Sequence, residues 1–95
     1  MAAPDFLVHD KVDTVGVVVV ENAAKGKKLS GWVMENDKTI NVKSVDAVPL
    51  GHKVALQPIK SGDTIIKYGH DIGKAIKDIP KGGHVHVHNV KTKRW

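Results

Sequence analysis

The stretch that decides the fold is Ile59-Lys60-Ser61-Gly62-Asp63-Thr64-Ile65. A second copy, Ile79-Pro80-Lys81-Gly82-Gly83-His84-Val85, aligns with it position by position. Each copy has an apolar anchor, a turn that contains glycine, and the start of a new strand. We expect the glycine to adopt a positive φ, which it tolerates because it has no Cβ. A looser copy occurs at Ala24-Lys25-Gly26-Lys27-Lys28-Leu29. The repeat predicts successive turn-and-strand units in a compact β fold.

The composition also indicates an all-β domain. The chain has 95 residues, enough for one domain with a single modest core. Of these, 41% are hydrophobic and only 4% aromatic, and the apolar residues include much valine and isoleucine, which favour strands. We therefore expect residues 1–95 to form one small domain of short strands and glycine-rich turns with little helix. Residues 1–4 and the basic tail 91–95 are expected to be flexible.

Periodicity and turn signals place the individual strands. The continuous apolar run 17–20 predicts burial on both faces of its strand. Segment 68–78 has apolar residues at helical spacing, but Gly69 and Gly73 weaken a helix, so strand or irregular structure is favoured there. The remaining strands are expected at 6–9, 14–21, 29–35, 39–43 and 53–57.

Several functional classes are disfavoured by what the sequence lacks. There is no cysteine, which excludes disulfides and thiolate sites. The first residues do not resemble a leader peptide, and the longest apolar stretch, 15–20, is far shorter than the ~20 residues of a membrane span. The net charge of +5 raises nucleic acid as a partner, but aromatics for base stacking are few. We expect a soluble, cytoplasmic protein that binds neither membrane nor nucleic acid, whose lysines form a solvated surface or attract a small anion or an acidic partner.

Histidines supply the most suggestive pattern. In an extended strand, His84, His86 and His88 would project from one face. Such a row could ligate a metal, exchange protons near neutral pH, or be the wet side of a sheet. His52 lies where a loop meets a strand, and from spacing alone we interpret it as a surface histidine beside Lys53. These alternatives remain open at the level of spacing.

The motifs that are missing and the small size of the domain both limit the kind of site it can form. The chain has no paired carboxylates, no phosphate-binding glycine loop and no convincing Ser-His-Asp set. A domain this small also has difficulty enclosing a ligand pocket of ~300 Å³ or more. If the histidines are catalytic, we expect another chain to supply the other wall of the site.

A family resemblance emerges from several motifs in order. They are Pro49-Leu50-Gly51-His52-Lys53-Val54-Ala55-Leu56, then Ile66-Lys67-Tyr68-Gly69 with Ile72-Gly73, then His84-Val85-His86-Val87-His88-Asn89. Together they resemble the SAF domain, of β-clip fold, at the N-terminus of altronate and galactarate dehydratases. The segment Asp13-Thr14-Val15-Gly16-Val17 resembles the first motif of that family, so the similarity spans nearly the whole chain.

The resemblance implies a lyase. The chain stops where the sugar-acid dehydratases continue into a large catalytic domain, which implies a free-standing small subunit with a large catalytic (beta) subunit as its partner. The implied reaction eliminates sulfite from (2R)-sulfolactate to give pyruvate. The alternatives are the small subunit of an altronate- or galactarate-type dehydratase, which eliminates water, and a non-catalytic binding or stabilising module. Motifs this short do not decide between sulfolactate and a sugar acid.

Site residues follow from the same resemblance. It implies catalytic roles for His52, His86 and His88, with His86 and His88 also candidate ligands of a divalent metal, iron (Fe²⁺) or Mn²⁺, bound mainly by the large subunit. Lys53, Tyr68 and Asn89 are candidates for binding a small anionic 2-hydroxy acid. Base and ligand roles are left open among the histidines. His84 is assigned to the preceding turn and not to the site.

Overall fold

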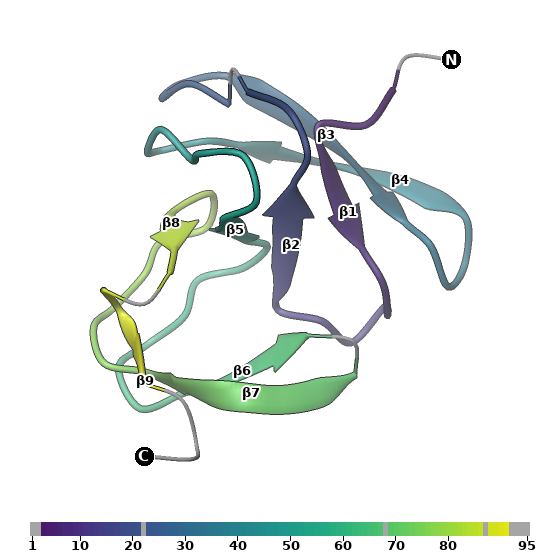
Figure 1. Cartoon of the computed structure of the whole chain (residues 1–95). Helices are drawn as coiled ribbons and strands as arrows, with labels where there is room; N and C mark the ends of the chain where they lie inside the picture. The colour runs from purple at the N-terminus through teal and green to yellow at the C-terminus, as the bar shows by residue number, and fades with distance from the viewer. Residues whose placement is uncertain (1–2, 22, 68, 87, 92–95) are drawn as a thin grey trace.

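A computed structural model describes residues 3–21, 23–67, 69–86 and 88–91, and there the chain forms nine strands and no helix (Figure 1). The strands are β1 (Phe6–Val8), β2 (Val15–Val18), β3 (Lys28–Val33), β4 (Lys38–Lys43), β5 (Lys53–Ala55), β6 (Thr64–Lys67), β7 (His70–Ala75), β8 (His84–Val85) and β9 (Val90–Lys91). The predicted all-β fold is confirmed. Each of the five strands expected between residues 6 and 57 is present, and β7 occupies the ambiguous segment. No helix in the described part of the chain could cross a membrane.

The strands form two sheets. One has six strands in the order β4-β3-β1-β2-β5-β8, and the other has three in the order β6-β7-β9. In Figure 1 the three-stranded sheet lies beneath the six-stranded sheet, near the start of β2. Thr14 links the two sheets, because its backbone N–H and its hydroxyl both bond β6: Thr14 N donates to Ile66 O, and Ile66 N donates to Thr14 Oγ1, both at 3.0 Å.

The repeat predicted from sequence is present as three equivalent turns. Gly26, Gly62 and Gly82 have φ values of 84°, 93° and 83°, so the predicted positive φ is confirmed. In each turn the residue after glycine donates its N–H to the carbonyl three residues earlier, at 3.2, 2.9 and 2.8 Å respectively. Each glycine N–H also donates to a carbonyl of a distant segment, at Ser44, Ala75 and Ala55. The turns therefore join the strands to each other as well as reversing the chain.

Two apolar clusters make up the core. The cluster inside the six-stranded sheet contains Phe6, Val8, Val18, Ala23, Leu29, Val33, Val42, Val48 and Val54. The cluster between the two sheets contains Val15, Ala55, Ile59, Ile65, Ala75, Ile79 and Val85. The anchors of the two clear repeat copies, Ile59 and Ile79, pair through reciprocal N–H···O bonds of 2.7 Å. The two clear copies of the repeat therefore contribute their apolar anchors to the second cluster.

The histidine row does not form one extended strand, so that expectation is wrong. β8 contains only His84–Val85, and the chain then turns. The Asn89 side chain closes this turn: its Oδ1 accepts from His86 N at 3.0 Å, and its Nδ2 donates to His84 O at 2.7 Å. Side-chain amides that bond nearby backbone in this way compete with strand pairing. A local side-chain turn made by one asparagine therefore overrides the strand pattern.

The apolar run after β2 also departs from expectation. β2 ends at Val18, and Val19 is 39% exposed, so the predicted burial on both faces is wrong there. The Val18 and Val19 N–H groups donate to His52 O and Asp5 O, at 2.9 Å each. The chain leaves the sheet at this point and turns Val19 outward.

Candidate functional site

Strand register brings the histidines together. β5 and β8 pair antiparallel, with Lys53 opposite Val85 and Val54 opposite His84. Continuing this register by one residue sets His52 opposite His86. The His52 and His86 rings stack, with centroids 3.7 Å apart and planes inclined by 14°. The loop histidine and the turn histidine thus meet because the two strands between them are paired.

His84 joins the group through its ring. His52 Nδ1 and His84 Nε2 are 2.7 Å apart and form a hydrogen bond. One nitrogen must donate and the other accept, so the tautomer of each ring fixes that of the other. The His84 ring also lies 4.8 Å from that of His88, tilted by 45°. His52, His84, His86 and His88 form what we call the histidine cluster.

One nitrogen of the cluster lacks a partner. His86 Nδ1 is the only side-chain nitrogen or oxygen in the described part of the chain that is buried without a hydrogen bond. Leaving a buried polar atom unsatisfied is unfavourable, and such atoms are uncommon in folded proteins. A group from outside the chain would satisfy this nitrogen, which makes His86 the strongest indication of a binding site.

The surroundings of His84 and His86 favour their neutral forms. Burial lowers the pKa of His84, and His88, His52 and His86 lower it further, with Asp46 opposing them. Burial likewise lowers the pKa of His86, followed by the charges of His52, Lys53 and His88. Neutral imidazole has a free lone pair, which is the form that accepts a proton or binds a metal. Both rings are therefore held in the chemically useful state near neutral pH.

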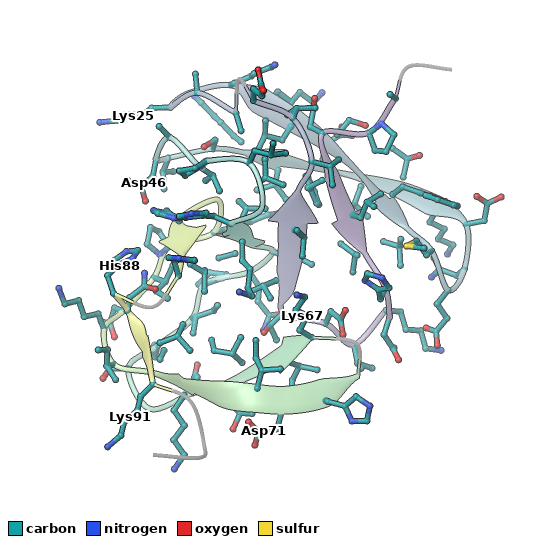
Figure 2. The ribbon with its side chains drawn as sticks, viewed as in Figure 1. Lys25, Asp46, Lys67, Asp71, His88 and Lys91 are labelled. Carbon is teal, nitrogen blue, oxygen red and sulfur yellow. The ribbon has the colours of Figure 1, made fainter. Side chains whose placement is uncertain are left out.

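Lys53 brings positive charge to the same place. It is half-buried on β5, and burial lowers its pKa, with Lys67 the second cause. The charge of Lys53 acts on His86, so its ammonium lies within electrostatic range of the cluster. Figure 2 shows Lys67 reaching from the end of β6 toward the six-stranded sheet. Substrate binding by Lys53 stays a prediction, and Lys67 was not predicted from sequence.

Two further residues position the histidines. Asn89 is 6% exposed, and its amide is used within the turn, as described above. Asp46, which sequence reasoning missed, accepts a 3.0 Å hydrogen bond at Oδ2 from His84 N. Direct contact of Asn89 with substrate stays a prediction, and Tyr68 lies outside the described residues.

The donor set suits part of a metal site. Neutral imidazole is a good ligand for iron, whereas manganese favours oxygen ligands. Across the described ranges, no three histidine, aspartate or glutamate side chains are grouped so that they could hold a metal ion. The cluster can therefore offer one or two nitrogen ligands, and a complete coordination sphere needs ligands from elsewhere.

Sequence reasoning found three of the four histidines of the cluster. The structure brings His52, His86 and His88 together, although their chemical roles stay predictions. It adds His84, which we had assigned to the turn. The i, i+2 spacing was the signal for His84, and its bond to His52 required the β5–β8 pairing, which no local pattern reveals.

Comparison with known proteins gives a consistent set of relatives. A family model described as the altronate/galactarate dehydratase SAF domain matches residues 4–93. The (2R)-sulfolactate sulfo-lyase subunit alpha of Chromohalobacter salexigens is 54% identical over 91 residues, covering 96% of this chain and 97% of the relative. The protein of the same name from Paracoccus pantotrophus is 65% identical over 48 residues, covering 50% of this chain and 72% of the relative.

A longer relative carries the same domain. The altronate dehydratase of Bacillus subtilis is 39% identical over 87 residues, which cover 92% of this chain but only 16% of that protein. The domain therefore occurs both almost alone and as a small part of a much longer chain.

Proposed function

The chain belongs to the altronate/galactarate dehydratase SAF domain family, and from this we propose that it is the alpha subunit of a (2R)-sulfolactate sulfo-lyase. The observation that carries the proposal is the 54% identity to a protein of that name over 97% of its length. The histidine cluster supplies the chemistry such a subunit would contribute. We place the complex in the cytoplasm, and propose that the chain is inactive without a large subunit.

The reaction is an elimination. A base removes the proton from the carbon that bears the hydroxyl, beside the carboxylate. A double bond forms to the neighbouring carbon, whose bond to sulfur breaks, and sulfite leaves with the electron pair. The enol that remains takes a proton on the carbon that lost sulfite and becomes pyruvate. The difficult step is the first, because a proton beside a carboxylate is weakly acidic.

The cluster can perform the proton transfers. His86, neutral and with a buried free nitrogen, is the candidate base, and the hydrogen-bonded pair of His52 and His84 is the candidate to return a proton to the enol. Alternatively, His86 Nδ1 is a metal ligand and His52 or His88 is the base. Lys53 is the candidate partner for the substrate's sulfonate or carboxylate, since its ammonium lies near the cluster.

A divalent cation with ligands from both subunits would fit this reaction. We propose Fe²⁺ or Mn²⁺, held mainly by the large subunit, with His86 and His88 as the candidate ligands from this chain. When bound, it would stabilise negative charge that develops on the substrate's carboxylate and hydroxyl oxygens. The buried, unpaired His86 Nδ1 supports a ligand at that position.

The decisive experiment assays the reconstituted pair. The chain is co-expressed with a large lyase subunit, and (2R)-sulfolactate and altronate are supplied separately. We expect sulfite and pyruvate in equal amounts from sulfolactate, and neither from the small chain alone. Water elimination from altronate without sulfite release would instead establish the dehydratase, which the similarity to the Bacillus subtilis protein favours as the second candidate. Full turnover by the large subunit alone would make this chain a non-catalytic module.

A further inference from the structure

An apolar surface adjoins the histidine cluster. Val19, Val45 and Leu50 are 39%, 37% and 53% exposed. They belong to two segments that lie side by side, one continuing from the end of β2 and one spanning 44–52: Val48 N donates to Ala23 O at 2.9 Å, and Gly51 N donates to Val18 O at 2.8 Å. Between these segments is an open pocket of about 390 Å³ lined by Glu21, Ala23, Ala24, Ala47, Val48 and Pro49. We call the exposed side chains of Val19, Val45 and Leu50, together with this pocket, the apolar rim.

The rim is preformed. Pro49 O accepts a 3.0 Å hydrogen bond from His52 N, and Gly51 has a φ of 84°, so residues 49–52 form a tight turn with Leu50 at its tip. Val45 N donates to Gly82 O at 3.1 Å and fixes the start of the same loop. A rigid surface loses little conformational entropy on binding, which favours association.

The same loop holds the site. Its last residue, His52, stacks on His86, and its Asp46 binds the His84 backbone. Figure 2 shows Asp46 and His88 on the same side of the molecule. A chain that covers the rim is therefore adjacent to the histidine cluster, which needs additional groups to complete a metal site or to satisfy His86 Nδ1.

The relatives indicate which chain must bind. In the altronate dehydratase this domain is 16% of one chain and is covalently joined to the rest. The sulfo-lyase alpha subunit consists almost entirely of the domain, since 97% of it is matched. A domain that is not covalently joined must hold its partner by surface contacts. Clustered exposed apolar side chains are the usual basis of such contacts.

We infer that the apolar rim is the docking surface for the large lyase subunit and sets the histidine cluster against it. This inference rests on the proposed function for the identity of the partner. It gives Val19, Val45 and Leu50 a role in binding the large subunit, whereas the proposed reaction uses none of these side chains.

The test measures binding without substrate. The purified large subunit is titrated with the chain and with two variants, Val45→Asp/Leu50→Asp and Val12→Asp. Val12 is 56% exposed in the turn at the opposite end of β2, so it is the matched control. We expect the rim variant to weaken binding at least about tenfold, as central interface residues do, and Val12→Asp to change it less than about twofold. Leu50→Ser is a milder variant that should show a smaller loss in the same direction.

Each other outcome has a defined meaning. Equal binding by wild type and rim variant, both folded by circular dichroism, overturns the inference, and so does equal weakening by Val12→Asp. Self-association of the chain that Leu50→Asp abolishes would also overturn it, since a second copy would then occupy the rim. A wild-type pair that binds through the rim but releases no sulfite leaves the docking surface intact and defeats the proposed reaction.

Discussion

His86 carries two properties that rarely occur together in one side chain. Its ring is stacked on His52, which restricts its orientation, and its Nδ1 is buried without a partner. Restricted orientation and an unused lone pair are what a base or ligand needs before substrate arrives. The i, i+2 spacing of the histidines pointed to this residue, but its stacking depends on a loop residue distant in sequence. Contacts of this kind arise from tertiary pairing and are not visible in a local pattern.

Removing the imidazoles at the centre of the cluster should abolish turnover. In the reconstituted pair, we expect His86→Ala/His88→Ala to lower kcat by at least about 100-fold, the typical contribution of a proton-transfer group. Sulfite release reports the rate. His70→Ala, an exposed histidine on β7, is the control and should retain nearly full activity. Full turnover by the double variant would show that the cluster is not catalytic.

Acid should destabilise the isolated chain. The folded pKa values of His84 and His86 lie below the usual value of 6.5, so the unfolded chain binds more protons than the folded chain once pH falls below that value. Stability from these groups is complete above about pH 6.5 and is lost as pH falls toward their lower folded values. Thermal midpoints between pH 8 and pH 5 measure this loss. His84→Asn/His86→Asn should flatten the dependence, and an unchanged slope would contradict the assignment.

The repeated turn is the element that the sequence predicted best. Its glycine conformation and its following strands occur as expected, because a positive φ is a local requirement that glycine satisfies directly. Strand lengths were predicted less well. β2 ends before Val19, whose N–H bonds the distant Asp5, and β8 ends before His86, whose N–H bonds the nearby Asn89 side chain.

Two of these glycines should differ sharply in tolerance of alanine. At Gly62 an added Cβ meets nothing within 4 Å, whereas at Gly82 it would lie 2.0 Å from Lys43 O. Both substitutions incur the positive-φ cost of about 1–2 kcal/mol, and Gly82→Ala adds an overpacking cost of about 1–3 kcal/mol. Urea denaturation of the two variants measures the difference. Equal losses would mean that the Gly82 turn moves away from β4 at little cost.

At the scale of the whole molecule, the domain has two cores but one incomplete site. The two apolar clusters contain all the buried hydrophobic side chains described. The histidine cluster is different, since it lacks a third metal ligand among the described residues and leaves one nitrogen unsatisfied. From the small size of the domain we expect a second chain to complete the site, and this stays a prediction. Sequence alone does not indicate where such a chain would bind, because the exposure of Val19 and Leu50 follows from the path of two loops.

A metal chelator should abolish the activity of the two-subunit complex but leave the thermal stability of the isolated chain nearly unchanged. If the cation is held mainly by the large subunit, a chelator should abolish sulfite release by the complex and restore it when Fe²⁺ or Mn²⁺ is added back. The thermal midpoint of the isolated chain should shift by less than about 1 °C, since a ligand that does not bind the folded state adds no stability. A large shift would place a complete metal site in this chain.

The histidine cluster can form only once β5 and β8 have paired. His52 is synthesised well before His84 and His86, and β8, which pairs with β5, comes after β6 and β7 in the chain. Contacts between residues distant in sequence form late in folding, because a long loop must close first. We therefore expect a nascent or nicked chain without β8 to keep its N-terminal strands yet present no cluster beside the rim. Assembly with the large subunit would then favour chains in which β8 has already paired with β5.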